Sequence, residues 1–292
     1  MSDVYAMITE VDPAAVEQVA NAMEVSASDP QQQAMVAAYL SDVAFPPDAR
    51  VLEIGCGTGA ISRLLAARPK VGQVLGVDPS PILLAQAREL AAGISNLSFQ
   101  EADGRDLPLP DASFDVVVVH RVLSHRPGPE RVLGQAFRVL RAGGWLAAFD
   151  GDYATITVAT GDFDLLQACV AAFTPAYITD PWVVRCLPAM VHQAGFAEGR
   201  LRSHGFVQTS EPDYMLSIAD RGADPLATAG RIGQELADAL KAEARRRGDR
   251  PLLLRPRRLC QPHGTETGSP AHGAVTSSTT GSARARLAAP AT

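Results

Sequence analysis

An apolar run enters a glycine-rich turn early in this chain, in the sequence V-L-E-I-G-C-G-T-G-A-I of residues 51–61. Glycine tolerates left-handed backbone angles and has no Cβ, so a ligand can lie directly against a main chain built from it. The pattern predicts a strand, a tight turn and the start of a helix, as in sites for nucleotide-like cofactors. Asp78 ends the next apolar run, V-L-G-V-D-P, where a doubly wound sheet places a carboxylate beside a ribose.

This turn has two other interpretations. Glycines also occur in tight turns that bind nothing. In addition, Gly55, Gly57 and Ala60 satisfy the G-x-G-x-x-G/A fingerprint of a dinucleotide-binding fold, with an acidic residue downstream. The turn alone therefore does not decide the cofactor.

Two later segments extend the pattern. Residues 101–119, E-A-D-G-R-D-L-P-L-P-D-A-S-F-D-V-V-V-V, join an acidic loop to a strand of buried type, and residues 138–149, R-V-L-R-A-G-G-W-L-A-A-F, join a helix end to another strand. With residues 51–61, this series resembles the class I S-adenosylmethionine-dependent methyltransferases, especially the small-molecule branch of the ubiquinone and menaquinone C-methyltransferases. The resemblance is strong over residues 33–149 and fades beyond them. Glu53, Gly59 and the loop at 102–104 distinguish it from a nicotinamide domain.

The resemblance implies roles for residues around the turn. Glu53 and the glycine turn would hold the methionine part of S-adenosyl-L-methionine, Asp78 its ribose hydroxyls, and Asp103 with the Gly104 backbone its adenine edge. His120 would lie where the family lines the methionine end. The implied cofactor-binding residues are Glu53, Gly55, Cys56, Gly57, Gly59, Asp78, Pro79, Ala102, Asp103, Gly104 and His120.

The catalytic group is a separate question. Methyl transfer from a sulfonium is an in-line displacement with an activated leaving group, so the protein mainly aligns the reactants and manages one proton, and no metal is required. His125 follows the valine run at 116–119, at the sheet edge where ligands bind, and an imidazole titrates near neutral pH. We therefore predict His125 as the general base, although His120 and His125 could both be structural.

Three function classes stay open. The resemblance implies an enzyme that methylates a small molecule at carbon, oxygen or nitrogen. The few charges in residues 154–196 suggest an apolar or aromatic acceptor, which Asp150, Asp152 and Tyr153 could orient. The alternatives are a cofactor-binding protein of the same fold without turnover and, from the fingerprint, a nicotinamide-dependent oxidoreductase. The intact glycine turn and its two downstream acids favour the enzyme.

Predicted strands alternate with predicted helices through the first half of the chain. Crossover connections of this kind give a parallel sheet with helices on both faces. We predict an α/β, doubly wound, mostly parallel sheet of the seven-stranded, Rossmann-like methyltransferase type, with N-terminal lid helices and a helical insertion after strand five. The predicted strands are residues 50–54, 73–77, 97–101, 114–119 and 145–149, with an edge strand at 199–208; the predicted helices are 12–23, 31–43, 60–67, 81–92, 129–140, 163–173, 181–194 and 218–244.

We divide the chain into residues 1–45 as lid helices, 46–150 as the cofactor-binding core, 151–254 as substrate-pocket helices and sheet edge, and 255–292 as a disordered tail. The lid helices begin at Asp12-Pro13 and Asp29-Pro30 and could equally serve only to cover one face of the sheet. The tail has no apolar periodicity. The family usually adds a seventh strand, and its only candidate is P-L-L-L at residues 251–254, unless the natural C-terminus has been replaced.

Composition limits the partners. A chain of 292 residues with a net charge of −6 and a pI near 5.5 lacks the basic balance of a nucleic-acid-binding protein. No basic-then-apolar signal region begins the chain, and no run approaches 18 apolar residues, so we expect no membrane insertion and a cytoplasmic location. Oligomeric state stays open. The cysteines contain no C-x-x-C pair, which suggests a reducing compartment without a zinc site; they are Cys56, Cys169, Cys186 and Cys260.

Overall fold

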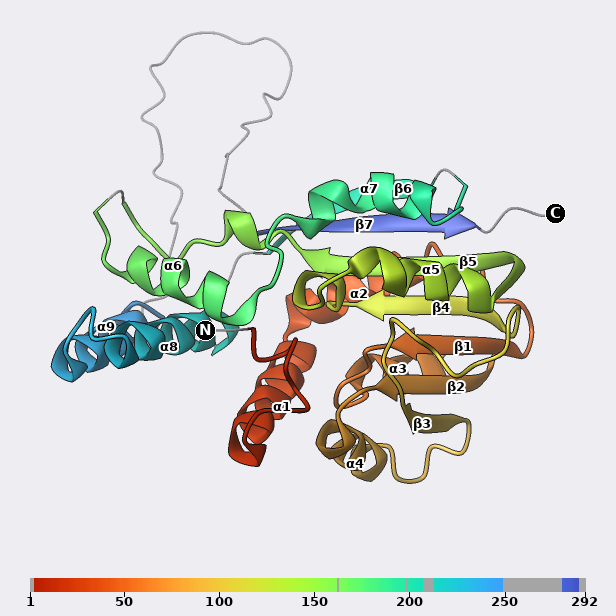
Figure 1. The fold of residues 1–292 in the computed structure, drawn as a ribbon, viewed down its shortest axis with the longest axis horizontal. Helices are drawn as coiled ribbons and strands as arrows, with labels where there is room; N and C mark the ends of the chain where they lie inside the picture. The colour runs from red at the N-terminus through yellow and green to blue at the C-terminus, as the bar shows by residue number, and fades with distance from the viewer. Residues whose placement is uncertain (1–2, 162, 198, 207–212, 249–279, 289–292) are drawn as a thin grey trace, which may run out of the picture.

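A sheet with helices on both faces forms the centre of the molecule (Figure 1). The computed structural model describes residues 3–161, 163–197, 199–206, 213–248 and 280–288. Within them the sheet has seven strands in the order β3-β2-β1-β4-β5-β7-β6. The strands are β1 (Ala49–Ile54), β2 (Val71–Asp78), β3 (Leu97–Glu101), β4 (Phe114–His120), β5 (Leu140–Gly151), β6 (Arg200–Phe206) and β7 (Thr280–Ala288).

The described helices lie close to their predicted positions, apart from one that is divided. They are α1 (Pro13–Ser28), α2 (Pro30–Leu40), α3 (Ala60–Ala66), α4 (Pro81–Leu90), α5 (Pro129–Val139), α6 (Leu166–Tyr177), α7 (Val183–Gln193), α8 (Asp213–Thr228) and α9 (Gln234–Gly248). The predicted helix at 218–244 is divided between α8 and α9. Gly230, at φ +65°, lies between them in the left-handed region that ends helices. No described helix combines the length and the apolar character needed to cross a bilayer.

The central strands are buried on both faces, as their valine run predicts. β1 pairs in parallel with β2 and β4, and β4 pairs in parallel with β5. Along β4, Val116 and Val118 pack on the side of α2 and α3, whereas Val117 and Val119 pack on the side of α5 and α7. All four are at most 1% exposed, because successive side chains of a strand point to opposite faces. The predicted α/β fold class is confirmed.

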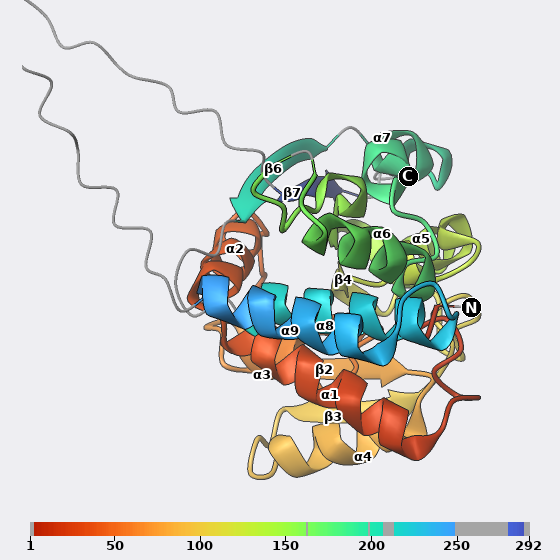
Figure 2. The ribbon, with the colours of Figure 1, turned by 90° about the vertical axis from the view of Figure 1, so that its left-hand side faces the viewer.

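The first two helices start where the sequence indicates. The Asp12 carboxylate accepts from Ala14 N at 2.8 Å, the Asp29 carboxylate accepts from Gln31 N at 2.8 Å, and each is followed by a proline at the first helical position. α2 packs on the sheet, while α1 crosses in front of the strand ends beside α8 (Figure 2). Helix α1, which precedes β1, and helix α8, which follows β5, thus meet over one edge of the sheet.

The prediction of a disordered tail at 255–292 is wrong for residues 280–288. These form β7, which pairs antiparallel with both β5 and β6, so that Ala285 faces Ala148 on one side and Leu201 on the other. A strand between two others is held mainly by backbone hydrogen bonds, for which apolar residues are not required. The sequence S-A-R-A-R-L-A alternates with a period of two, the strand period, which a search for apolar runs overlooks. The candidate strand at 251–254 lies outside the described residues.

Candidate functional site

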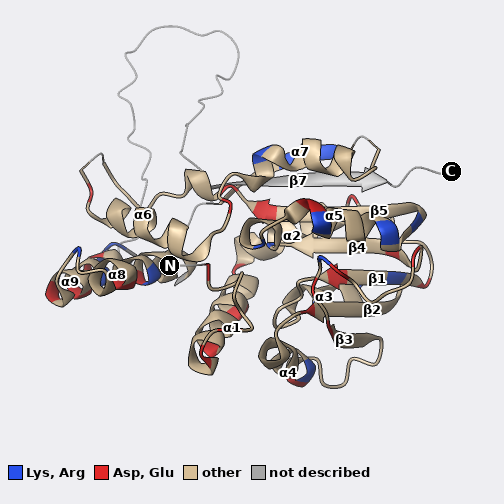
Figure 3. Ribbon diagram, viewed as in Figure 1, with Lys and Arg blue, Asp and Glu red and all other residues tan. Residues whose placement is uncertain are grey.

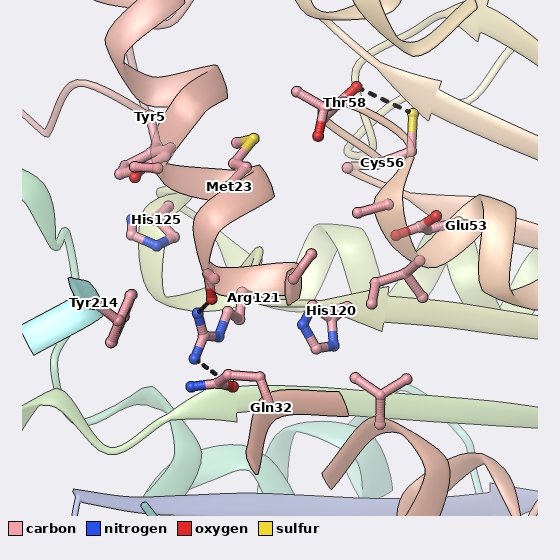
Figure 4. Close-up of a pocket in the computed structure, with 18 of the residues that line it drawn as sticks. Tyr5, Met23, Gln32, Glu53, Cys56, Thr58, His120, Arg121, His125 and Tyr214 are labelled. Carbon is pink, nitrogen blue, oxygen red and sulfur yellow. Dashed lines mark hydrogen bonds between the residues drawn. The ribbon is translucent and has the colours of Figure 1, made fainter. Parts of the chain in front are cut away.

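Two adjoining cavities lie at the carboxyl ends of β1, β2 and β4. The first is enclosed by the glycine turn, α1, α2, α6 and α8, and the second continues along the end of β2. Figure 4 shows the first cavity. Both are lined by Tyr5, Met23, Gly55, Arg121 and His125, so they form one connected site. This is the edge of an open α/β sheet at which ligands bind.

The glycine turn is shaped for close contact with a ligand. Gly55, Gly57 and Gly59 have φ angles of 73°, 51° and 75°, all in the left-handed region. A Cβ on Gly55 would lie 2.4 Å from Val122 Cγ2. One on Gly57 would lie 2.7 Å from Met23 Sδ, the flexible tip of an α1 side chain that covers the turn. The backbone angles and the close neighbours therefore require glycine here, and the turn lines the first cavity without side chains at Gly55 and Gly57.

Glu53 lies buried beneath this turn and lines the first cavity. The residue is 2% exposed, and its carboxyl group accepts a hydrogen bond from the Ser62 hydroxyl. Burial, with a smaller contribution from the nearby Asp78 charge, raises the pKa of Glu53 to about 8. A cationic ligand group beside Glu53 would favour the ionised form again.

Asp78 lines the second cavity together with Pro79 and Gly104. One carboxylate oxygen accepts from Gly57 N at 2.9 Å and the other from Ser80 N at 2.9 Å. These bonds connect the end of β2 to the glycine turn and leave further lone pairs on each oxygen. Burial raises the pKa of Asp78, which is 7% exposed.

Three predicted cofactor residues lie outside both cavities. Ala102 and Asp103 follow β3, and Asp103 is held by Arg105 at 2.7 Å and by Arg126 at 3.2 Å. The hydrogen bond from Arg105 lowers the pKa of Asp103 to about 2. Gly59 begins α3, where a Cβ would meet the ring of Phe99 at 2.7 Å. Among the other predicted residues, Glu53, Gly55, Cys56, Gly57 and His120 line the first cavity, and Asp78, Pro79 and Gly104 line the second.

His120 ends β4 and forms part of the cavity wall. Its ring stacks on Phe149 with centroids 4.9 Å apart, and its Nδ1 lies 3.1 Å from the Tyr39 hydroxyl. Burial and the neighbouring Arg121 cation lower the pKa of His120 to about 3. The imidazole is therefore neutral near pH 7, which favours a contact role over proton transfer.

His125 lies in the short helical turn Leu123–His125 and lines both cavities. Its Nδ1 lies 2.9 Å from the Tyr177 carbonyl oxygen and 3.2 Å from an Asp3 carboxylate oxygen. Because a carbonyl oxygen only accepts, we assign the proton to Nδ1, and Nε2 is left as the acceptor. A base oriented through its second nitrogen is a common catalytic arrangement.

The sequence predictions missed several residues of the first cavity. Arg121, at φ +55°, donates to the Ser26 hydroxyl at 2.8 Å and to Gln32 Oε1 at 2.9 Å. Figure 4 shows it between Tyr214 and His120. Arg221 and Tyr214 come from α8, whose approach to the cavity has no local sequence signal. Within the described residues, no group of three His, Cys, Asp or Glu side chains is arranged as metal ligands.

Comparisons with known proteins agree with this geometry. A protein-family model described as a methyltransferase domain matches residues 52–148. An uncharacterized 37.1 kDa protein in a Streptomyces fradiae transposon is 32% identical over 152 residues, which are 52% of this chain and 44% of that protein. Demethylmenaquinone methyltransferase of Thermus thermophilus is 35% identical over 102 residues, 35% of this chain and 46% of the relative. The chain thus spans less than half the length of these curated relatives.

A solved structure shares the fold over most of the chain. The 4+2 cyclase SpnF covers 89% of this chain and 82% of its own, with a TM-score of 0.54 and 20% identity. An identity this low shows the fold alone. The family match, the shared fold, the glycine turn and the position of the cavities agree. Residues 52–148 form a methyltransferase domain of the class I, S-adenosylmethionine-dependent type.

Proposed function

We propose that this chain transfers a methyl group from S-adenosyl-L-methionine to carbon, oxygen or nitrogen of a small, apolar or aromatic acceptor. The observation that carries the proposal is the left-handed glycine turn, which lines a cavity that aromatic side chains also line. These side chains are Tyr5, Tyr153, Phe173 and Tyr214. Aromatic and apolar surface favours acceptors of the same character.

The residues around the turn suit the parts of this cofactor. Glu53 would ionise beside the methionine ammonium group, and the bare backbone at Gly57 would admit the chain of the methionine. The unused lone pairs of Asp78 would accept from the ribose hydroxyls. Gly104, with Ala102 and Asp103 beside it, marks the expected adenine end of the second cavity.

The protein's remaining task is to align the acceptor and remove one proton. When bound, the cofactor supplies a methyl group on an activated sulfonium leaving group, so alignment provides much of the rate. His125 lines both cavities, and its Nε2 is free to accept a proton from the acceptor. We therefore propose His125 as the general base and His120 as a wall of the methionine end.

A second candidate is a protein of the same fold that binds the cofactor without turnover. The nicotinamide alternative is weaker, because the family match over residues 52–148 is to a methyltransferase domain.

Calorimetry and a labelled-donor assay separate these candidates. We expect S-adenosylhomocysteine to bind, NAD not to bind, and label from S-adenosylmethionine to appear in at least one member of a panel of aromatic metabolites. Asp78→Asn should weaken S-adenosylhomocysteine binding by roughly 1.5–3 kcal/mol, the scale of a hydrogen bond to a charged group. The matched control is Asp111→Asn, an exposed carboxylate paired with Arg138. Binding of NAD instead of S-adenosylhomocysteine would refute the proposal.

We further propose a cytoplasmic protein without a nucleic-acid partner. The net charge is −6, and acidic and basic residues are interspersed over the described elements (Figure 3). Nucleic-acid binding would instead require a basic face. The division into lid helices, core and pocket helices is also proposed, because α1 and α2 both contribute residues to the first cavity.

A further inference from the structure

Two arginines line the first cavity from opposite parts of the fold. Arg121 follows β4, and Arg221 lies on α8. Both are half-buried, and neither has a carboxylate partner among the described side chains. Removing a cation from water without an anionic partner is costly, so such residues commonly mark the place of a charged ligand group.

Carboxylates on α8 and at the end of β5 are engaged with other partners. On α8 itself, Asp220 pairs with Arg245 at 2.5 Å and Asp224 pairs with Lys241, both from α9. Asp150 is close enough to Arg121 to interact with its charge. Its oxygens, however, accept from Ser124 N at 3.0 Å, Ser124 Oγ at 2.7 Å and Gly151 N at 2.8 Å.

Arg221 is positioned by neutral groups only. Its Nε donates to the Ser217 carbonyl at 3.3 Å, and one terminal nitrogen donates to the Tyr5 hydroxyl at 3.2 Å. Its Cζ lies 4.8 Å from the Phe173 ring centre and 5.0 Å from that of Tyr177. Stacking on two aromatic faces holds the planar guanidinium without neutralising its charge. Most of its five N–H donors have no partner among the described residues.

Arg121 adds further unpaired donors to the same cavity. Its Nε and Gln32 Nε2 are both buried without a hydrogen-bond partner among the described residues, although both residues line the cavity. Arg121 donates to Gln32 Oε1, which leaves the amide nitrogen of Gln32 free to donate. The cavity therefore combines aromatic walls, two cations and surplus donors, and an anion supplies the acceptors that these groups lack.

We propose that the acceptor substrate is an aromatic or apolar acid whose carboxylate pairs with Arg221, with Arg121 and Gln32 as additional donors. This inference rests on the proposed function, because it places the acid in the acceptor part of the same site. The Arg221 contacts with Phe173 and Tyr177 place the acid group at α6 and α8, in the cavity that the glycine turn also lines. The aromatic body would lie among the rings of the first cavity.

Paired probes test the proposal on the full chain saturated with S-adenosylhomocysteine. Benzoate, 1-naphthoate and 2-naphthoate are each titrated against the corresponding neutral amide. We expect at least one acid to bind roughly 10–100-fold more tightly than its amide, as for hydrogen bonds to charged groups. Arg221→Gln should abolish this preference, Arg221→Lys should keep part of it, and the exposed Arg231→Gln should keep all of it. Absence of acid preference in every pair, or its survival in Arg221→Gln, would overturn the proposal.

The cofactor has a carboxylate of its own, so a second comparison is required. Affinities for S-adenosylhomocysteine and for 5′-methylthioadenosine, which lacks that carboxylate, are measured for wild type and Arg221→Gln. We expect both affinities to be unchanged by the substitution. A selective loss of S-adenosylhomocysteine binding would assign Arg221 to the cofactor and refute the acceptor proposal. Failure of the wild type to bind S-adenosylhomocysteine would refute the proposed function itself.

Discussion

Glu53 illustrates how burial alone changes the chemistry of a residue. Glu53 lies near the end of a central strand, paired with Gly76 on β2 and Val118 on β4, and its carboxyl group accepts a hydrogen bond from the Ser62 hydroxyl. Burial raises the pKa of Glu53 to about 8, above the ordinary value of about 4.3. The native protein therefore holds this proton more tightly than the unfolded chain does.

The stability of the ligand-free protein should depend on pH through Glu53. Between about pH 4.3 and pH 8 the native state binds the extra proton, so the unfolding free energy falls as pH rises, by at most about 1.4 kcal/mol per pH unit. Glu53→Gln should remove this contribution, so its urea midpoint should fall less between pH 5 and pH 8 than that of wild type. The exposed Glu10→Gln is the control and should follow wild type. Parallel profiles for wild type and Glu53→Gln would contradict the expected ionisation.

His125 should affect turnover more than cofactor binding. Its Nδ1 is held by Tyr177 O at 2.9 Å, which leaves Nε2 for the acceptor. We expect His125→Ala to lower kcat by roughly 10²–10⁴-fold with nearly unchanged S-adenosylhomocysteine affinity, as for loss of a general base. The comparison is made with the acceptor found in the labelled-donor panel, with exposed His192→Ala as control. A loss of cofactor binding would make His125 a wall residue, and an unchanged rate would leave alignment to explain catalysis.

The sequence indicates where a residue lies when its position in a strand or turn fixes that place, whereas the roles of these residues stay predictions. Glu53 and Asp78 lie near strand ends and Gly57 in the turn between β1 and α3, and a parallel sheet brings these positions to one edge. Arg221 was missed because it lies in the middle of an ordinary amphipathic helix, and only the packing of α8 on α6 brings it to the cavity. Such information is not contained in the residues around it.

At the scale of elements, α1 is attached to the glycine turn by one acidic side chain. Glu24 accepts from Arg63 at 2.8 Å and from the Thr58 hydroxyl at 2.5 Å. Both partners belong to the turn and the helix that follows it. Met23, next to Glu24, covers Gly57. α1 can therefore slow the entry and release of a ligand bound at the turn.

Breaking this attachment should loosen the cover over the cofactor. We expect Glu24→Gln to accelerate the dissociation of S-adenosylhomocysteine by about 2- to 5-fold, the range for losing a partly exposed ion pair. Stopped-flow measurement of the dissociation rate tests this, with Glu17→Gln, an exposed residue of the same helix, as control. Equal rates for Glu24→Gln and wild type would show that α1 does not restrain the ligand.

Elements of the core were predictable because they are buried on both faces. The valine run of β4 and the proline-started helices α1 and α2 have strong local signals, and each was placed within a few residues. β7 has a weaker signal, because its alternating Ala and Arg residues have the strand period but contain no apolar run. Its place in the sheet follows from the open edges of β5 and β6, which are distant in the sequence.

At the scale of the whole molecule, β7 connects the cofactor core to the sheet edge. It lies between β5 and β6, so β6 reaches the rest of the sheet only through it. β5 carries Phe149, which stacks on His120, and Asp150, which accepts from the Ser124 hydroxyl at 2.7 Å. The pairing of β7 with β5 therefore links the sheet edge to the wall of the first cavity. We expect the C-terminal strand to contribute to the stability of the site.

A single proline in β7 tests this connection. Ala285 pairs with Ala148 on β5 and Leu201 on β6, and a proline there would remove the N–H group from a strand with neighbours on both sides. The carbonyl group on the neighbouring strand that loses this N–H donor is left unpaired, which lowers the free energy of unfolding by roughly 1–3 kcal/mol. Ala285→Pro should therefore lower Tm by about 2–10 °C. Ala285→Ser keeps the N–H group and should unfold like wild type. If Ala285→Pro matched Ala285→Ser in both Tm and S-adenosylhomocysteine affinity, residues 280–288 would not be part of the sheet in solution, and the original prediction of a disordered tail would be restored.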